Sequence, residues 1–209
     1  MYTPAGFART DIAALHEFIE QHSFGLLVTS RGCGDEAAPE ASHLPFLLDR
    51  DQGRNGRLIG HFARANGQWR DANGRRALTV FSGPHAYISP TWYGVQNSVP
   101  TWNYVAVHAT GTLRLIEDRD RLIKLLHQTV NVFEASRQPA WSLETPEPEF
   151  VERLLEAIVG FEIEIELLEG KWKLSQNHDA DRREAVVHGL QATGRAGDLE
   201  IAELMSTNA

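Results

Sequence analysis

Segments with the patterns of β-strands come in runs in this chain, and segments with helical periodicity stand between the runs. The clearest strand is residues 161–168 (FEIEIELL), where apolar and acidic side chains alternate strictly, as in a strand with one face in water. Regular alternation of single strands with helices would instead indicate a parallel, doubly wound sheet. The grouping predicts an antiparallel barrel with peripheral helices, which is a mainly β fold of the α+β class.

Hydrophobic periodicity and turn residues locate the individual elements. Pro45 places its strand at an edge or a bulge of the sheet, because proline cannot donate a hydrogen bond to a neighbouring strand. Asp118 is the expected N-cap of a helix. The remaining strands are expected at 24–29, 43–48, 57–62, 78–82, 86–89 and 103–116 (with a glycine break at 111), and helices at 10–22, 118–134, 149–158 and twice after residue 179.

Charge and composition limit the cellular compartment in which the chain can work and the kinds of partner that it can bind. The chain has 209 residues, a formal net charge of −8 and one cysteine, Cys33. No stretch reaches the ~20 apolar residues of a membrane span, and the N-terminus lacks a signal-peptide pattern. A single cysteine excludes an intrachain disulfide and a multi-cysteine zinc site. These features predict a cytoplasmic protein with no membrane association, and the acidity favours a small-molecule or protein binder over a DNA binder.

The segment GHFARANGQW (60–69) follows a predicted strand and combines basic, amide and glycine residues. Seven arginines fall within residues 50–76 against two acidic residues. Arginine suits a phosphate because its planar guanidinium can bond two oxygens at once, and glycine lets the backbone approach a ligand. A solvated arginine surface is the alternative. The position at a strand end favours an anion site formed by His61, Arg64, Asn66 and Gln68.

Residues 81–104 hold six of the eighteen aromatic side chains, together with three prolines. Rings left in water cost ~25 cal/mol per Å² of apolar surface, so they must cover a core, a partner subunit or a flat ligand. Core filling accounts for Phe81 and some of the tyrosines. The two Pro-Thr-Trp copies, 90–92 and 100–102, indicate rigid turns that direct tryptophans toward an interface or a planar cofactor.

Residues 169–177 (EGKWKLSQN) place Lys171 and Lys173 on one face of an extended segment. Ser175, Gln176 and Asn177 follow, with uncharged groups suited to the carbonyls and ring nitrogens of a heterocycle. When this segment is taken alone, the alternative is that the two lysines are simply exposed to solvent.

Motifs of several catalytic classes are absent from the sequence. It contains no GxGxxG, GxxxxGK[ST], HExxH or GxSxG pattern, and its nine histidines are scattered. Cys33 has no obvious histidine partner. We therefore assign no catalytic residue and no metal ligand.

Four blocks in order, GHFARAN, GPHAYISPTWY, TWNY and GKWKLSQN, resemble the PaiB family, whose members are described as negative transcriptional regulators. The resemblance runs from Met1 to about Leu190. It implies an FMN-binding split β-barrel, shared with pyridoxamine-phosphate-oxidase-like flavoproteins, that forms homodimers and binds FMN or a related planar ligand at the subunit interface. It also implies one domain over 1–190, with 191–209 as a helical tail packed on the same domain.

The resemblance, together with side-chain chemistry, also suggests a role for each block. The residues on the phosphate side would be His61, Arg64, Asn66 and Gln68; those along the ring or the dimer contact Ser82, His85, Trp92, Thr101, Trp102 and Asn103; and those closing the pocket Lys171, Lys173, Gln176 and Asn177.

The expected function is an FMN-binding transcriptional regulator that senses or uses a flavin at a homodimer interface. Three alternatives stay open: an FMN-dependent oxidoreductase of the pyridoxamine-phosphate-oxidase-like or flavin reductase type, a haem-binding split barrel, and a dimeric interaction protein without a ligand. Charge does not support DNA contact, because the tail 179–209 carries six acidic residues against three arginines. Regulation is therefore expected to be indirect or to use the arginines of 50–76. The histidines available to a haem are His43, His61, His85 and His108.

Overall fold

The computed structural model describes residues 1–32, 34 and 37–207. The expectations for Cys33 therefore lie outside the described residues.

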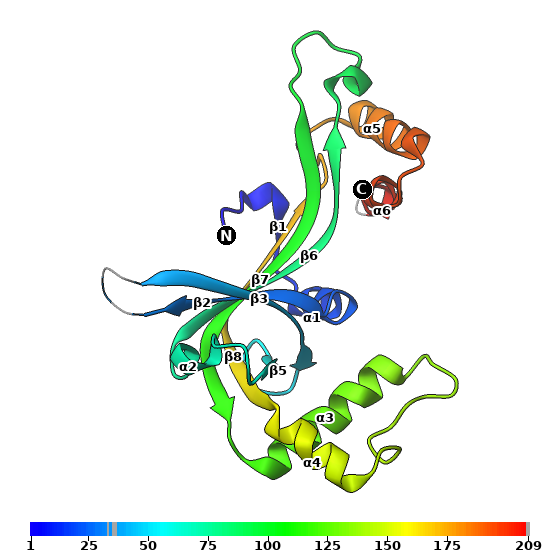
Figure 1. Cartoon of the computed structure of the whole chain (residues 1–209). Helices are drawn as coiled ribbons and strands as arrows, with labels where there is room; N and C mark the ends of the chain where they lie inside the picture. Colours follow the sequence, from blue (N-terminus) through cyan, green and yellow to red (C-terminus); the bar gives the residue numbers. More distant parts are fainter. Residues whose placement is uncertain (33, 35–36, 208–209) are drawn as a thin grey trace. The chain divides into compact units, whose positions relative to one another are not determined.

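Eight strands form one sheet with the order β3-β2-β6-β7-β8-β5-β4, and β1 pairs with β8 (Figure 1). The strand registers are antiparallel. Over the described residues the ladder begins at β3 and ends at β4, so the sheet does not close on itself. The predicted antiparallel α+β class is confirmed. The strands are β1 (Ala8–Arg9), β2 (Phe24–Arg31), β3 (Ala38–Pro45), β4 (Leu47–Asp49), β5 (Arg57–Ala63), β6 (Arg76–Ile88), β7 (Thr101–Ile116) and β8 (Ile158–Lys173).

The helices follow the predicted segments closely. Asp118 caps α3 as expected, since its carboxylate accepts a hydrogen bond of 2.8 Å from the backbone N–H of Arg121. Asp179 caps α5 in the same way. The helices are α1 (Ile12–Gln21), α2 (Trp69–Ala72), α3 (Arg119–Glu134), α4 (Pro148–Glu156), α5 (Ala180–Thr193) and α6 (Ala196–Thr207), with 3₁₀ turns η1 (Ala5–Phe7) and η3 (Pro90–Tyr93).

Strand β6 corrects the prediction of two separate strands at 78–82 and 86–89. Its thirteen residues run continuously through Pro84. The pairing with β2 extends only from Leu78 to Val80, so the missing N–H of Pro84 removes no bond to that neighbour. Proline is tolerated here because the strand has lost its β2 partner four residues earlier.

Strands β3 and β7 also differ from the prediction. β3 begins at Ala38, five residues before the strand expected at 43–48, because eight residue pairs join it to β2. Its end at Pro45 and its place at one end of the sheet confirm the expected edge position. Gly111 does not break β7: a Cβ there would lie 2.0 Å from the Glu164 carbonyl oxygen. The glycine permits a close backbone approach and leaves the strand intact.

The chain divides into two compact units. Unit 1 comprises Met1–Asp11, Ser82–His108 and Glu169–Ala209, and unit 2 comprises Ile12–Phe81 and Ala109–Leu168. Strands β6, β7 and β8 each contribute residues to both units. The boundary expected at residue 190 falls inside α5.

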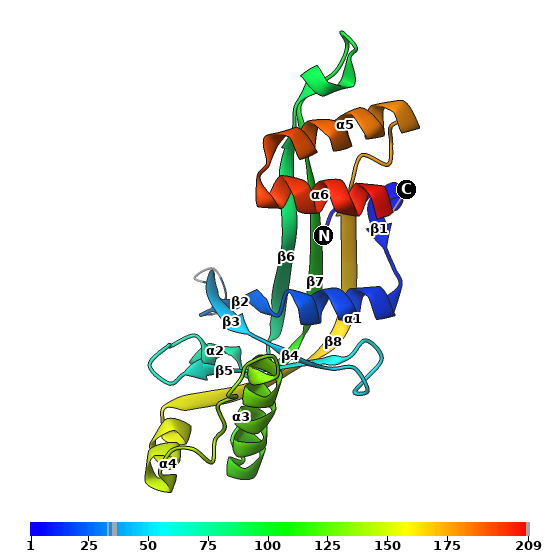
Figure 2. The ribbon, with the colours of Figure 1, turned by 90° about the vertical axis from the view of Figure 1, so that its right-hand side faces the viewer.

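Each unit has its own buried apolar residues. In unit 2 the phenylalanines form an aromatic cluster, with ring centroids 5.5 Å apart for Phe46–Phe81 and 4.7 Å for Phe62–Phe161. In unit 1, α5 and α6 lie against one face of β6 and β7, as Figure 2 shows. Leu190, Ile201 and Met205 are buried there. No helix among the described residues is both long and apolar enough to cross a membrane.

Candidate functional site

Unit 1 contains a cavity of about 380 Å³, within the usual range for small-molecule sites. Its lining comes from the beginning of β7, the end of β8 and the segments that flank them. Three predicted site residues line it: Thr101, Lys173 and Asn177. The other lining residues are Phe7, Tyr93, Asn97, Ser98, Val99, Ser175, His178 and Arg182. We call this cavity the unit 1 pocket.

The unit 1 pocket is cationic. Lys173 and Arg182 line it, and no carboxylate is among its described lining residues. The Lys173 ammonium donates hydrogen bonds to Thr101 Oγ1 at 2.5 Å and to the Trp102 carbonyl oxygen at 2.6 Å. Burial, and then the nearby charge of Lys171, lowers the pKa of Lys173. With two of its three protons used, this ammonium keeps one donor for an anion.

Two further lining residues, Tyr93 and Ser175, are nearly buried. Tyr93 is 7 % exposed, and its hydroxyl makes no hydrogen bond of acceptable geometry with a described residue. Burial raises the pKa of Tyr93, although Arg182 and the Ser175 hydroxyl partly oppose this. Ser175 has a φ of 62°, the left-handed region that non-glycine residues rarely adopt. Its hydroxyl shares hydrogen bonds of 3.0 and 3.3 Å with the buried amide of Asn103.

Lys171 and Gln176 do not line the pocket, but they stabilise the segment next to it. The Lys171 ammonium is buried, donates to the Tyr2 carbonyl oxygen at 3.0 Å, and lies over the rings of Tyr2 and Tyr104. Gln176 accepts from the Leu174 N–H at 2.7 Å. These contacts hold the end of β8 and the loop that follows it.

The predicted aromatic residues separate into two groups. Trp102 is 53 % exposed, and its ring lies 5.8 Å from that of Tyr87 and 6.1 Å from that of His85. Ser82 is exposed on the same strand as Tyr87 and His85. Trp92 instead packs against Gly189 of α5, where a Cβ would lie 2.4 Å from the ring. The first Pro-Thr-Trp copy is the turn η3, but the second leads into β7 and is not a turn.

The predicted phosphate residues lie in unit 2, where three of the four form hydrogen bonds with other residues of the chain. Arg64 donates to the carbonyl oxygens of Glu156 at 2.6 Å and Ile158 at 2.8 Å. Gln68, 1 % exposed, donates to Thr29 Oγ1 at 3.0 Å. Asn66 Nδ2 donates to Ser42 Oγ at 2.8 Å. Burial lowers the pKa of His61, which favours the neutral ring.

The comparisons with known proteins identify the family. Residues 1–167 match the family model described as "Putative FMN-binding domain". The chain is 35 % identical over 206 residues to "Protease synthase and sporulation protein PAI 2" of Bacillus subtilis (strain 168), covering 98 % of this chain and 96 % of the relative. The chain belongs to the PaiB family. FMN, the cofactor predicted from the sequence, is the one that the description of the matched family names.

More distant relatives and solved structures extend the similarity of this PaiB-family chain. A protein of Emericella nidulans, "Uncharacterized protein AN0679", is 28 % identical over 242 residues, covering 98 % of this chain and 96 % of the relative. The flavocytochrome Anf3 from Azotobacter vinelandii aligns with a TM-score of 0.59 at 16 % identity, covering 79 % of this chain and 69 % of that one. The FAD and heme binding protein from Mycobacterium smegmatis aligns with a TM-score of 0.57 at 17 % identity, covering 85 % of this chain and 78 % of that one. These two structures share the fold of the PaiB-family chain.

The residues of this PaiB-family chain fit the phosphate of FMN at the unit 1 pocket. Lys173 and Arg182 supply positive charge, and Tyr93 supplies a buried hydroxyl that makes no hydrogen bond of acceptable geometry with a described residue. Sequence reasoning missed Tyr93, His178 and Arg182 as site residues, whereas Ser175 had been noted only as a hydrogen-bonding group of the GKWKLSQN block. The signal for Arg182 was its position five residues after Asn177, at the end of the GKWKLSQN block.

Proposed function

We propose that this chain is an FMN-binding regulator that works as a cytoplasmic homodimer, and that Lys173 and Arg182 hold the flavin phosphate in the unit 1 pocket. The observation that carries the proposal is a pocket with two cations and no carboxylate among its described lining residues, in a chain with a net charge of −8. Charge-assisted bonds to Lys and Arg are the strongest that a phosphate makes with side chains. The match to an FMN-binding family supports the same ligand.

The chain's own residues bind and orient the cofactor, while FMN, when bound, supplies the electron-transfer chemistry. The Lys173 ammonium is oriented by Thr101 Oγ1 and the Trp102 carbonyl oxygen, so its third proton has a restricted direction. Arg182 lies near Asp179, at 3.7 Å, a distance too long to occupy its guanidinium protons fully. Both cations therefore keep donors for phosphate oxygens.

A homodimer is favoured by the exposed aromatic face of unit 1. Trp102 is 53 % and Tyr87 47 % exposed, and their rings contact each other on the face opposite Asn103, which is buried beneath α6. Large exposed aromatic groups mark interfaces or ligand surfaces. A partner subunit or the flavin ring would cover them.

Regulation is proposed to be indirect, because the arginines of residues 50–76 are mostly engaged within the chain. Three of the seven form ion pairs with glutamates, and two donate to backbone carbonyl oxygens. Few of them are left to neutralise DNA phosphates, on which duplex affinity largely depends. The paired residues are Arg50, Arg57 and Arg76, and those bound to carbonyl oxygens are Arg64 and Arg75.

The absorption spectrum of the purified protein, followed by FMN titration of the cofactor-free chain, tests the proposal. We expect a flavin spectrum and saturable FMN binding. Arg182→Ala should weaken binding by about ten- to a hundredfold, the range expected for a bond to a charged group. Arg195→Ala, an exposed change in the same unit, is the matched control. A chain that binds no FMN, or that loses no affinity with Arg182→Ala, contradicts the proposal.

The second candidate is a flavin-dependent oxidoreductase or a haem-binding protein. It is favoured by the names of the two proteins that share the fold, a flavocytochrome and an FAD and heme binding protein. A Soret band would indicate haem, and oxidation of NADPH by the FMN-loaded chain would indicate an enzyme.

A further inference from the structure

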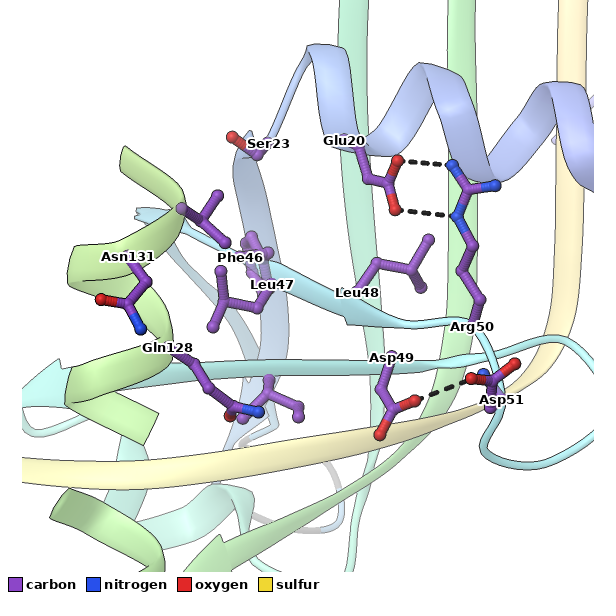
Figure 3. A pocket seen from close by; sticks show the side chains of 12 residues that line it. Glu20, Ser23, Phe46, Leu47, Leu48, Asp49, Arg50, Asp51, Gln128 and Asn131 are labelled. Carbon is purple, nitrogen blue, oxygen red and sulfur yellow. Dashed lines mark hydrogen bonds and ion pairs between the residues drawn. The ribbon is translucent and has the colours of Figure 1, made fainter. Parts of the chain in front are cut away.

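Unit 2 contains a second and larger cavity, of about 730 Å³, that the flavin site does not use. It lies between α1, β4, β5 and α3, and all of its lining residues belong to unit 2 (Figure 3). The volume lies within the 300–1,000 Å³ typical of small-molecule sites. We call it the unit 2 cavity.

The floor of the unit 2 cavity is apolar. Phe46 is almost fully buried, and Leu47, Leu48 and Ile59 are half-buried beside it. Val132 of α3 is 57 % exposed and completes the apolar lining. This surface would bury an aromatic or short aliphatic group of a ligand, at a gain of roughly 25 cal/mol per Å² of apolar surface.

The polar part of the cavity is acidic. Its lining has three carboxylates, those of Glu20, Asp49 and Asp51, and one guanidinium, that of Arg50. Arg50 is held by Glu20 through two hydrogen bonds of 2.8 and 2.5 Å, drawn in Figure 3. Neither aspartate lies within 4.0 Å of a basic group among the described residues. With three carboxylates and one guanidinium, the described lining residues carry a net charge of −2.

Two amide side chains of α3, those of Gln128 and Asn131, line the side of the cavity opposite these carboxylates, and the Gln128 side chain extends away from α3 in Figure 3. Neither side chain forms a hydrogen bond with another described residue. Their carbonyl oxygens are available as acceptors. Among the described residues, the half-buried Asp49 accepts one bond, of 3.3 Å, from the Asp51 N–H, so most of its acceptor capacity is also free for a ligand.

We propose that the unit 2 cavity binds a small organic cation, a primary ammonium attached to a short apolar body. The apolar body would lie over Leu47, Leu48 and Val132, and the ammonium would bond Asp49 and an amide oxygen of α3. An anion would meet two excess negative charges, and a neutral ligand would leave the carboxylates without a partner. The inference concerns residues different from those of the proposed flavin site and does not rest on it.

Titration of the full chain with 2-phenylethylammonium at low salt tests the proposal, with calorimetry or ligand-observed NMR as the readout. 2-Phenylethanol and 3-phenylpropanoate are the neutral and anionic comparison probes. We expect saturable one-site binding of the ammonium, about tenfold tighter than that of the alcohol, since a bond to a charged group contributes on that scale. The carboxylate should bind most weakly. Equal or tighter binding of the alcohol or the carboxylate overturns the proposal.

Two variants locate the site. Asp49→Asn should weaken binding of the ammonium by about tenfold, whereas Asp120→Asn, the same charge change at an exposed position of unit 2, should leave it unchanged. Val132→Trp fills the cavity from an exposed position, and should abolish binding without unfolding the chain. Undiminished binding in Val132→Trp or Asp49→Asn contradicts the proposal.

Two further measurements separate the remaining outcomes. FMN titration of the same variants should give wild-type affinity, so that failure of the cation site and failure of the flavin site are distinguishable. Sedimentation of Val132→Trp tests a different occupant. Conversion of a dimer to a monomer by this substitution would identify a second copy of the chain as what fills the cavity, and would overturn the cation proposal.

Discussion

The two cavities of this chain have opposite charge. The unit 1 pocket has Lys173 and Arg182 in its lining and no described carboxylate, whereas the unit 2 cavity has three carboxylates and one arginine that is already paired. The net charge of the whole chain, −8, does not predict the charge of either cavity. The difference teaches that ligand preference depends on which charges remain unpaired at a cavity, and the pairing depends on the fold.

Two glycines, one in each unit, differ in what an added Cβ would meet. At Gly111 in unit 2 an added Cβ would meet the carbonyl oxygen of Glu164, which is backbone. At Gly189 in unit 1 it would meet the ring of Trp92, which is a half-buried side chain. A strand held by a sheet yields less readily than a side chain does, so equivalent substitutions in the two units should have unequal costs.

The largest expected effect tests this packing difference. Gly111→Ala should lower the free energy of unfolding by about 3 kcal/mol or more, because the overlap is with backbone. Gly189→Ala should cost less, about 2 kcal/mol at most, since the Trp92 ring must move but is not backbone, and alanine favours the helix by about 1 kcal/mol. Urea unfolding of both variants measures the contrast. Equal costs would show that the two contacts are equally adaptable.

The next effect compares arginines of the two units as phosphate ligands. Arg64→Ala in unit 2 should change FMN affinity less than threefold, because the Arg64 guanidinium already donates to two carbonyl oxygens. Arg182→Ala in unit 1 should reduce affinity by about ten- to a hundredfold. Fluorescence titration with FMN measures both. A larger loss for Arg64→Ala would restore the phosphate role that the sequence predicted for that residue.

A smaller effect concerns pH. Phosphate binding needs the protonated Lys173, and burial together with Lys171 lowers the pKa of this ammonium. FMN affinity should therefore fall as pH rises, and the fall should begin below the pH at which an ordinary lysine loses its proton. Lys173→Arg should remove this dependence because arginine stays charged. Affinity measured across an alkaline pH series would contradict the assignment if wild type and variant behaved alike.

The smallest expected effect is the loss of stability when the ion pair in the wall of the unit 2 cavity is removed. Glu20 and Arg50 are both exposed, so Arg50→Ala should cost only about 0.2–1 kcal/mol of stability, and less in high salt. Arg54→Ala, an exposed arginine of the same unit, is the control. Urea unfolding at two salt concentrations measures the difference. A cost well above 1 kcal/mol would mean that the pair supports the fold as well as the cavity.

Much of the fold could be predicted because local signals coincide with the elements. The helical stripe after Asp118 and the alternation in FEIEIELL both identify elements correctly, since side-chain period reflects backbone geometry. The continuous β6 could not be predicted from Pro84, because its tolerance depends on where β2 stops pairing. For the same reason Gly111 was interpreted as a break: its close partner, Glu164, is 53 residues away in sequence.

The candidate site also has features that the sequence predicts and features that only the tertiary structure decides. Two residues that the sequence predicts for the site from the GKWKLSQN block, Lys173 and Asn177, line the unit 1 pocket, and the order of the blocks predicts the family correctly. Which side chains stay free for a ligand was decided by the tertiary structure: Arg64 is bound to carbonyl oxygens, Lys171 is buried among tyrosines, and Arg182 lines the pocket. The physical reason is that a charged group's availability depends on its partners in space, and most of those partners are distant in the chain.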